Sequence, residues 1–170
     1  MKDTQAKSDL IRLALATPDG EFVAYYSAAG LAGLNFPGTG RIAPANAAAP
    51  ATVRAWHRMT ATALQSALAG REPGTLPPLD LSAGTAFQQS VWQALRQIRF
   101  GQTRSYGEIA RAIGKPRALR AVGGACGANP IPVLVPCHRV LAANQKIGGF
   151  SGGLDWKRRL LAREGFAVKS

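Results

Sequence analysis

The chain has 170 residues, with 21 Lys and Arg against 9 Asp and Glu, and only two Cys and two His. This length suits one domain or two small ones, and a hydrophobic content of 46% is enough for a buried core. No apolar run reaches the roughly 18 residues of a membrane helix, and no signal-peptide pattern opens the chain. Because two cysteines build no disulfide framework and zinc would need nearly every Cys and His, we expect a cytoplasmic protein without metal or membrane contact.

The positive charge is concentrated in the second half of the chain. Residues 1–86 contain 7 Lys and Arg and 6 Asp and Glu, a net charge of +1, whereas residues 87–170 contain 14 and 3, a net charge of +11. This bias favours a polyanionic partner for the second half; the alternative is a basic surface that maintains solubility. Five basic residues near the motifs described below favour nucleic acid: Arg111, Lys115, Arg117, Arg120 and Arg139.

The first half is expected to be strand-rich with one helix. Apolar runs over residues 10–16, 21–27 and 31–36, separated by turn residues, predict three short strands. Apolar residues at helical spacing over 53–68 predict a helix that ends at Gly70.

Two stretches rich in turn-forming residues predict the organisation of the chain. Residues 37–50 contain Pro, Gly and Ala without periodicity and predict a loop, and residues 71–84 contain three prolines and predict a linker. We therefore expect an N-terminal domain over 1–70, a linker over 71–84 and a C-terminal domain over 85–170. The expected fold class is α+β, with a mainly helical C-terminal domain.

The second half contains the pattern of a helix-turn-helix. An apolar stripe over 87–98 predicts one helix, and Ser105 with Glu108 has the spacing of a capping box that opens another, ending at Gly114. Pro116 breaks the chain and is suited to starting the next helix, which contains Leu119, Val122 and Cys126. Two short helices joined by a tight turn in a basic region resemble a DNA-binding helix-turn-helix.

The pair Gly123-Gly124 lies within the second of these helices. Each helical Gly costs roughly 1 kcal/mol relative to Ala, so the pair requires a reason. One explanation is a bare helix face that a DNA strand approaches closely, and the other is close packing against a neighbouring helix. The sequence favours neither.

Residues 129–140 predict the reactive centre. Three prolines within seven residues stiffen the chain before Cys137, and His138 follows it directly. A cysteine beside histidine and basic residues can be a stabilised thiolate, although an isolated Cys in an apolar run is more often an inert core residue. Cys126 fits that inert role, and His57 is expected to be partly buried or at the surface.

This region resembles a known family. The string Pro136-Cys137-His138-Arg139-Val140, with Asn129-Pro130 before it and the segment 148–165 after it, is similar to the methylated-DNA–protein-cysteine methyltransferases, the O6-alkylguanine-DNA alkyltransferases. The resemblance covers residues 85–165. The first half is similar only in size and strand content, and it lacks the cysteines with which some members bind zinc there. A non-catalytic branch replaces the motif cysteine, which this chain retains as Cys137.

The resemblance implies roles for five catalytic residues. Cys137 would accept the alkyl group, His138 would deprotonate it through a water, and Glu164 would orient His138. Asn129 would hold the turn before the reactive centre. Tyr106 would help rotate the target nucleotide and donate a proton to the leaving guanine.

The resemblance also implies contacts to DNA and to the damaged base. Arg120 would enter the base stack in place of the extruded base, and we expect Arg117, Gly123 and Gly124 to lie at the DNA surface. The expected guanine pocket consists of Phe150 as a wall for base stacking, Ser151, and the backbone at Cys137 and Val140. Relatives often have Tyr at position 150, and some have a basic residue at position 127, where this chain has Gly127.

The implied function is DNA repair by a suicide enzyme. The protein would flip O6-alkylguanine out of double-stranded DNA and transfer the alkyl group to Cys137 once, as a monomer without a cofactor. O4-alkylthymine is a second candidate substrate. The alternatives are a DNA-binding module without chemistry, either a lesion sensor or a transcription regulator, and a cysteine hydrolase, for which only His57 is available as a distant base.

Overall fold

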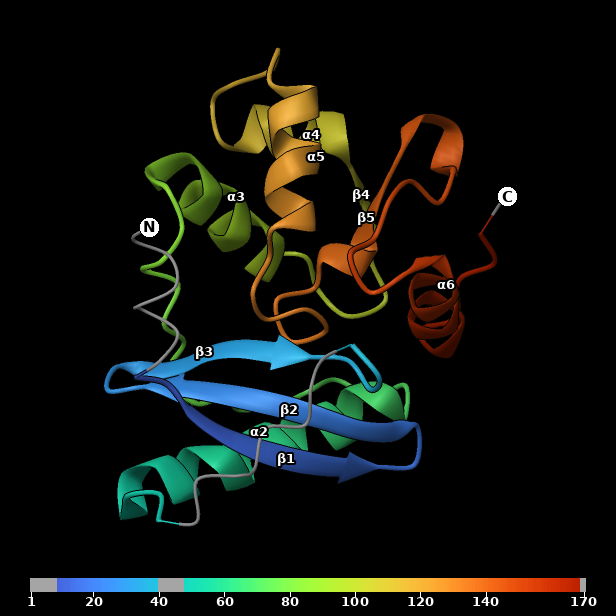
Figure 1. Cartoon of the computed structure of the whole chain (residues 1–170). Helices are drawn as coiled ribbons and strands as arrows, with labels where there is room; N and C mark the ends of the chain where they lie inside the picture. The colour runs from blue at the N-terminus through green and yellow to red at the C-terminus, as the bar shows by residue number, and fades with distance from the viewer. Residues whose placement is uncertain (1–8, 40–47, 169–170) are drawn as a thin grey trace.

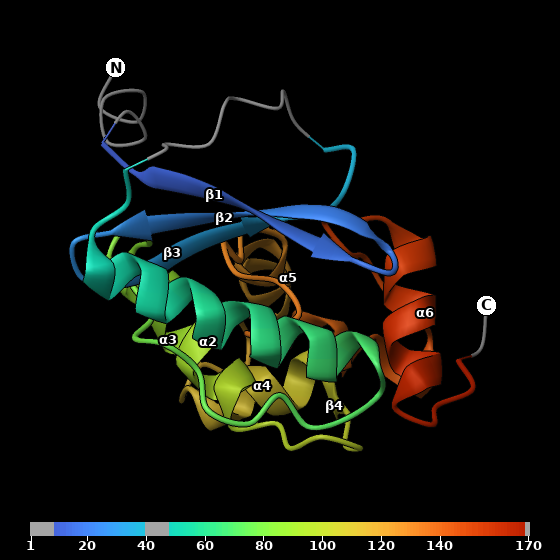
Figure 2. The same cartoon turned by 90° about the horizontal axis from the view of Figure 1, so that it is seen from below.

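The computed structural model describes residues 9–39 and 48–168, so most of the expected loop over 37–50 lies outside the described residues. The fold is α+β, as the sequence predicts. The three expected strands form one antiparallel sheet in the order β1-β2-β3, and their bounds are β1 Ile11–Thr17, β2 Gly20–Ser27 and β3 Gly30–Asn35. The expected helix is α2, Ala51–Leu68. Figure 1 shows most of the second half of the chain above the sheet, and Figure 2 shows α2 alongside the sheet, seen from below.

Alternating burial explains which face of the sheet is covered. Along β2, Phe22, Ala24 and Tyr26 are buried, whereas the residues between them are partly exposed, as expected for side chains that alternate across a strand. The Tyr26 hydroxyl lies 2.9 Å from His57 Nδ1 and donates to Thr60 Oγ1 at 3.0 Å, so its polar end is satisfied by α2. His57 is partly buried, as expected.

Residues 71–84 run along the edge of the sheet without a helix or a full strand. Leu31 N donates to Pro78 O at 2.8 Å, and Asp80 N donates to Leu31 O at 2.7 Å. The Asp80 carboxylate also accepts a hydrogen bond from the Ser27 hydroxyl at the end of β2. These contacts fix the segment to β3 before the chain enters the second half.

The second half is mainly helical, with a parallel two-stranded sheet formed by β4 and β5. Its elements are α3 Ala86–Arg96, β4 Arg104–Ser105, α4 Tyr106–Ala112, α5 Leu119–Gly127, the 3₁₀ turn η1 Cys137–Arg139, β5 Val140–Leu141, the 3₁₀ turn η2 Ala143–Gln145 and α6 Leu154–Arg163. The predicted capping box is present, because Ser105 Oγ accepts from Glu108 N and the Glu108 carboxylate accepts from Ser105 N.

The expectation that Pro116 starts the second helix of the pair is wrong. The chain first forms a tight turn, which Ala118 N closes by donating to Lys115 O at 2.9 Å, and α5 begins only at Leu119.

Within the described residues, none of the helices combines the length and the apolar character needed to cross a bilayer.

Candidate active site

An asparagine at the end of α5 shapes the loop that leads to Cys137. Asn129 Nδ2 donates to Val135 O at 2.8 Å, and Asn129 Oδ1 accepts from Ile131 N at 3.0 Å. The turn between them forces Val133 into the left-handed region, with φ of 74°. Because a β-branched residue is disfavoured there, the two side-chain hydrogen bonds stabilise a strained conformation.

Cys137 does not lie in a strand. It begins the 3₁₀ turn η1, and the strand β5 starts only at Val140. In a strand, consecutive side chains would point to opposite faces. In the 3₁₀ turn, both Cys137 and His138 are buried, with 4% and 1% of their surface exposed.

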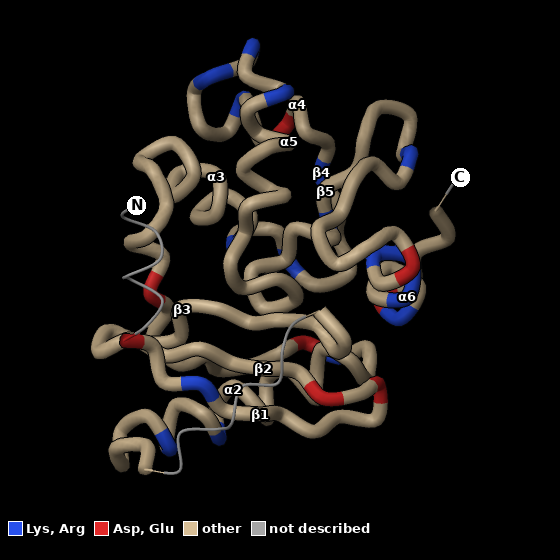
Figure 3. Tube along the Cα trace, viewed as in Figure 1, with Lys and Arg blue, Asp and Glu red and all other residues tan. Residues whose placement is uncertain are grey.

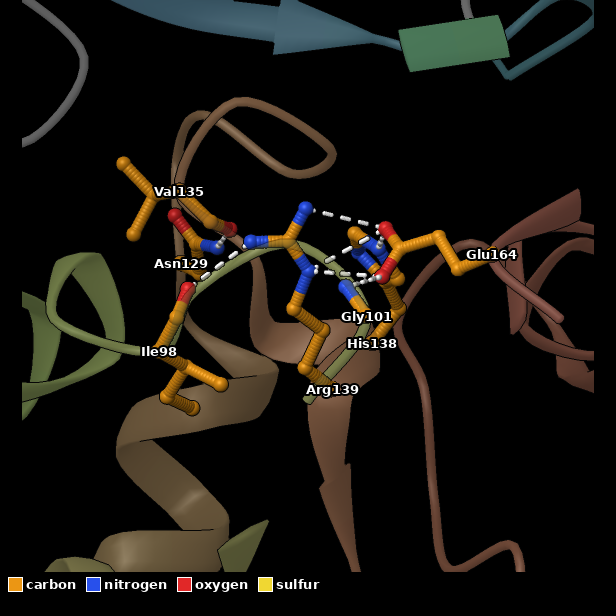
Figure 4. A network of polar contacts seen from close by, with 7 residues as sticks. All are labelled: Ile98, Gly101, Asn129, Val135, His138, Arg139 and Glu164. Carbon is orange, nitrogen blue, oxygen red and sulfur yellow. Dashed lines mark hydrogen bonds and ion pairs between the residues drawn. The ribbon is translucent and has the colours of Figure 1, made fainter. Parts of the chain in front are cut away.

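His138, Arg139 and Glu164 form a buried polar network (Figure 4). His138 Nε2 lies 2.8 Å from Glu164 Oε1. Arg139 binds the same carboxylate with two nitrogens, Nε to Oε2 and Nη2 to Oε1, each at 2.9 Å, and its Nη1 donates to Ile98 O at 2.8 Å. The carboxylate thus joins the C-terminal end of α6 to the reactive turn, 25 residues or more away in the chain.

The network determines which nitrogen of His138 is available as a base. A carboxylate only accepts hydrogen bonds, so Nε2 carries the proton and Nδ1 has the free lone pair. Nδ1 is buried and has no hydrogen-bond partner among the described residues. A water between Nδ1 and a nearby donor would satisfy it, because a buried acceptor without a partner is costly.

The electrostatics keep the imidazole neutral and the carboxylate charged. Burial, the largest influence, lowers the pKa of His138, and the hydrogen bond to Glu164 only partly opposes it. For Glu164, burial raises the pKa, but the hydrogen bonds and charges of His138 and Arg139 outweigh burial and the net pKa is lowered. Near neutral pH, His138 can therefore accept a proton while Glu164 remains ionised.

The resting side chain of Cys137 is a thiol. Burial raises the pKa of Cys137 to about 11, although a hydrogen bond with Asn129 and the charge of Lys157 lower it in part. This corrects the expectation of a stabilised thiolate, because the sequence shows the basic neighbours but not the depth of burial. A base must remove the thiol proton before the sulfur can react.

Cys137 opens onto a cavity of about 180 Å³ between α5 and the loop before α6. The cavity is also lined by Tyr106, Phe150 and Ser151, as expected for three of the site residues, and by Cys126. Cys126 is buried, as predicted, but it faces the same cavity and is not confined to the apolar core. A larger cavity of about 410 Å³ lies between β3 and α3 and has no nucleophilic or acidic side chain.

Tyr106 closes one side of the cavity. Burial raises the pKa of Tyr106, so its hydroxyl retains the proton near neutral pH. Gly148, with φ of 67°, passes so close that a Cβ there would lie 3.0 Å from the hydroxyl oxygen. Glycine is therefore required at this position both for its backbone conformation and for its small size.

Phe150 forms the opposite wall and is supported by the N-terminal sheet. Phe36, at the end of β3, packs edge-on against it with ring centroids 5.7 Å apart, and it also contacts Trp156 of α6 at 4.9 Å. The backbone at Gly152 is so close to Phe36 that a Cβ would lie 2.5 Å from its ring. The wall is therefore fixed by residues from both halves of the chain.

The pair α4 and α5 presents a basic, exposed surface next to the cavity. Arg117 and Arg120 are exposed in and just after the turn between these helices, where Figure 3 shows a cluster of Lys and Arg. A Cβ at Gly124 would have no neighbour within 4 Å, and one at Gly123 would meet only Tyr106, at 4.0 Å. Close packing on another helix therefore does not explain Gly124, and the bare helix face remains. Val140 is fully buried and is not among the residues that line the cavity.

Sequence reasoning missed two residues of the site, Arg139 and Lys157. Arg139 was noted only as a basic residue, but it is 5% exposed and holds Glu164. Lys157 is fully buried, and its spacing to Leu160 and Leu161 places it on the buried stripe of α6, where the sequence predicts an apolar residue. Only this exception to the pattern could have identified it.

No group of three His, Cys, Asp or Glu side chains that could hold a metal ion occurs within residues 9–39 and 48–168.

Comparison with known proteins identifies the family. Residues 86–166 match the family described as 6-O-methylguanine DNA methyltransferase, DNA binding domain. A methylated-DNA–protein-cysteine methyltransferase of Haemophilus influenzae is 56% identical over 81 residues, which are 48% of this chain and 45% of that protein, so the chain spans about half the length of this relative. The protein of the same name from Salmonella typhimurium is 45% identical over 120 residues, covering 66% of this chain and 70% of the relative.

The structural similarity extends over both halves of the chain. The crystal structure of Mycobacterium tuberculosis OGT in complex with DNA matches with a TM-score of 0.74 and 39% identity, covering 89% of this chain and 90% of that one. On these similarities, the chain belongs to the family of methylated-DNA–protein-cysteine methyltransferases.

Proposed function

We propose that this protein repairs DNA by transferring the alkyl group of O6-alkylguanine to Cys137 in a single turnover. The observation that carries this proposal is Cys137 at a cavity beside α5, followed directly by His138, whose buried Nδ1 has no hydrogen-bond partner among the described residues. The name of the relatives and the DNA bound to Mycobacterium tuberculosis OGT support the same activity. O4-alkylthymine is a second substrate to test.

The proposed chemistry assigns a role to each charged or polar group. A water relays the thiol proton of Cys137 to His138 Nδ1, and the carboxylate of Glu164 stabilises the imidazolium that forms. The thiolate attacks the alkyl carbon, a C–S bond forms, and the C–O6 bond breaks with its electron pair on guanine. Tyr106, still protonated, donates the proton that guanine needs. The thioether is a poor leaving group, so each molecule reacts once.

The proposed DNA contact uses the basic surface of the second half. The alkylated oxygen lies inside the duplex, so the nucleotide must be extruded before Cys137 can reach it, at a cost of about a few kcal/mol. Arg117 and the bare face at Gly123 and Gly124 contact the backbone, and Arg120 fills the vacated stack. Phe150 supports the extruded base, and Ser151 and the backbone at Cys137 and Val140 contact the guanine edge.

In this proposal residues 85–170 form the DNA-binding and acceptor domain, joined by residues 71–84 to an N-terminal domain over 1–70. The protein acts as a cytoplasmic monomer on duplex DNA and uses no cofactor or metal. Protein treated with a chelator should therefore keep its full repair stoichiometry. Stoichiometric zinc whose removal abolishes repair would contradict this part of the proposal.

The decisive experiment is intact-protein mass spectrometry after incubation with a duplex containing O6-methylguanine. We expect a gain of one methyl group per molecule, mapped to Cys137 by peptide analysis, and no further reaction with excess substrate. Cys137→Ser should gain none while it still binds the duplex, and Cys126→Ser should react like the original protein. Binding without mass gain would indicate a lesion sensor, and repeated turnover would indicate a hydrolase.

A further inference from the structure

Lys157 is a buried cation for which the proposed chemistry has no role. It lies on α6 with no exposed surface, and its Nζ donates to Val140 O at 2.6 Å and to Gly149 O at 3.1 Å. Both partners are neutral backbone carbonyls. Burying an ammonium group with only neutral partners costs free energy, so a simple packing role would be filled better by an apolar side chain.

The two carbonyls belong to opposite sides of the reactive centre. Val140 follows the 3₁₀ turn that begins with Cys137, and Gly149 lies in the loop that lines the cavity beside Phe150. The hydrogen bonds of Lys157 therefore fix the strand after the nucleophile to the wall of the cavity. Each carbonyl oxygen has two lone pairs, so Val140 O keeps one for another donor.

The charge of Lys157 also acts on the two thiols at the cavity. It lowers the pKa of Cys137 and of Cys126, each of which burial raises more strongly. Burial lowers the pKa of Lys157 itself to about 8, and the two thiols oppose that change. Two other titratable groups lie near Cys137. Tyr106 is protonated and neutral, and His138 is unprotonated and neutral, so neither supplies positive charge in the resting state.

We propose that Lys157 is a positioning residue that provides a buried positive charge near the Cys137 thiolate and fixes Val140 to the cavity loop. This inference rests on the proposed alkyl transfer to Cys137. The thiolate exists only after the thiol proton has moved to His138, so a nearby fixed ammonium stabilises the state from which transfer occurs. Burying Lys157 lowers the stability of the fold, and its charge promotes alkyl transfer in return.

Two substitutions separate the charge from the hydrogen bonds. Lys157→Met removes the charge and the hydrogen bonds with a side chain of similar length. Lys157→Gln removes the charge but keeps an NH₂ donor. Arg158→Met is the matched control, because it removes a neighbouring positive charge from the same helix at a side chain that is 47% exposed. None of the three changes a group that touches the alkyl carbon.

The main readout is the pH dependence of Cys137 alkylation by iodoacetamide, mapped by peptide mass spectrometry so that Cys126 is counted separately. At pH 7, where Lys157 with its pKa of about 8 is mostly protonated, we expect both Lys157 variants to react about tenfold more slowly, equivalent to a rise of about one unit in the thiol pKa. Arg158→Met should stay within about twofold. With O6-benzylguanine as a free-base substrate, Lys157→Met should raise the substrate concentration that half-saturates the single-turnover rate more than Lys157→Gln does. The melting temperature of Lys157→Met should be unchanged or higher.

These outcomes separate the inference from a structural role and from the proposed function. Unchanged thiol reactivity in both Lys157 variants would overturn it, as would a melting temperature several degrees lower with a normal thiol pKa. If instead the thiol responds as expected but no protein transfers alkyl groups from DNA, the charge assignment stands and the proposed function fails.

Discussion

Replacing Glu164 with Gln is the most informative single change at the site. The substitution keeps the size of the side chain but removes the negative charge shared by His138 and Arg139. An amide offers one oxygen and one NH₂ group, so it cannot accept from both partners with both atoms. If the NH₂ group faces His138, it donates to Nε2, and the ring proton then moves to Nδ1, which removes the proposed base.

The expected loss of stability follows from the burial of the pair. The side chains of Arg139 and Glu164 are 7% and 5% exposed, and two hydrogen bonds of 2.9 Å join them. Removing one partner of such a buried pair leaves an uncompensated charge and costs about 3–5 kcal/mol. That is a large part of the roughly 5–15 kcal/mol that stabilises a domain, so the variant should fold but melt clearly lower.

The pH dependence of this loss has a definite sign. The pKa of Glu164 is lowered from its ordinary value of 4.5, so its contribution to stability is fully present above pH 4.5 and is lost as the pH falls through the folded-state pKa. The difference in free energy of unfolding between the original protein and Glu164→Gln should therefore be constant near neutral pH and shrink below pH 4.5. Asp155→Asn, on an exposed residue of the same helix, should show no such difference.

The assay combines urea unfolding at several pH values with single-turnover transfer from a methylated duplex. We expect the transfer rate of Glu164→Gln to fall by about 10²- to 10⁴-fold at a temperature where the variant is fully folded, because general-base catalysis is lost. A stable variant with a normal transfer rate would refute both the buried ion pair and the assignment of His138 as the base.

Three further predictions test the loop, the DNA surface and the cavity wall. Asn129→Ala should lower stability by about 1–3 kcal/mol for each backbone group left unpaired and slow transfer, as measured by unfolding and single-turnover rates. Arg120→Ala should slow transfer from the duplex more than transfer from the free base, and equal effects on both rates would contradict its role in base extrusion. Arg117→Ala should only weaken DNA binding and reduce the dependence of the logarithm of the binding constant on log salt concentration by about one. Phe36→Ala should lower the free energy of unfolding by about 3–5 kcal/mol and raise the free-base concentration that half-saturates the single-turnover rate, because Phe150 loses its support. An unchanged half-saturating concentration would show that Phe150 keeps its position without Phe36.

Local patterns in the sequence predicted most elements of the fold. The three strands, α2, α3 and the capping box of α4 lie where apolar spacing and capping residues place them. The start of α5 was missed because proline favours a first helical turn and equally favours a tight turn, and the choice depends on the hydrogen bond from Ala118 to Lys115.

The candidate site was only partly predictable. The resemblance pointed to Cys137, His138 and Glu164, and the structure brings the last two within hydrogen-bond distance. The protonation of Cys137 was not predictable, because its pKa depends on burial by segments far away in the chain. Lys157 was missed for the same reason, since a lysine in a helical stripe normally extends its ammonium to solvent.

Residues 9–39 and 48–84 contribute no reactive group to the site, but they contact three parts of it. Leu34 N of β3 donates to Pro130 O in the loop before Cys137 at 2.8 Å, and Phe36 packs behind Phe150. Asp19, in the turn between β1 and β2, binds Arg163 with two hydrogen bonds of 2.9 and 2.7 Å, one residue before Glu164. The nucleophile loop, the cavity wall and the carboxylate are thus each held against the same sheet. Because the proposed transfer requires these groups within tenths of an ångström of one geometry, a sheet without a reactive side chain in the site can still be necessary for the reaction.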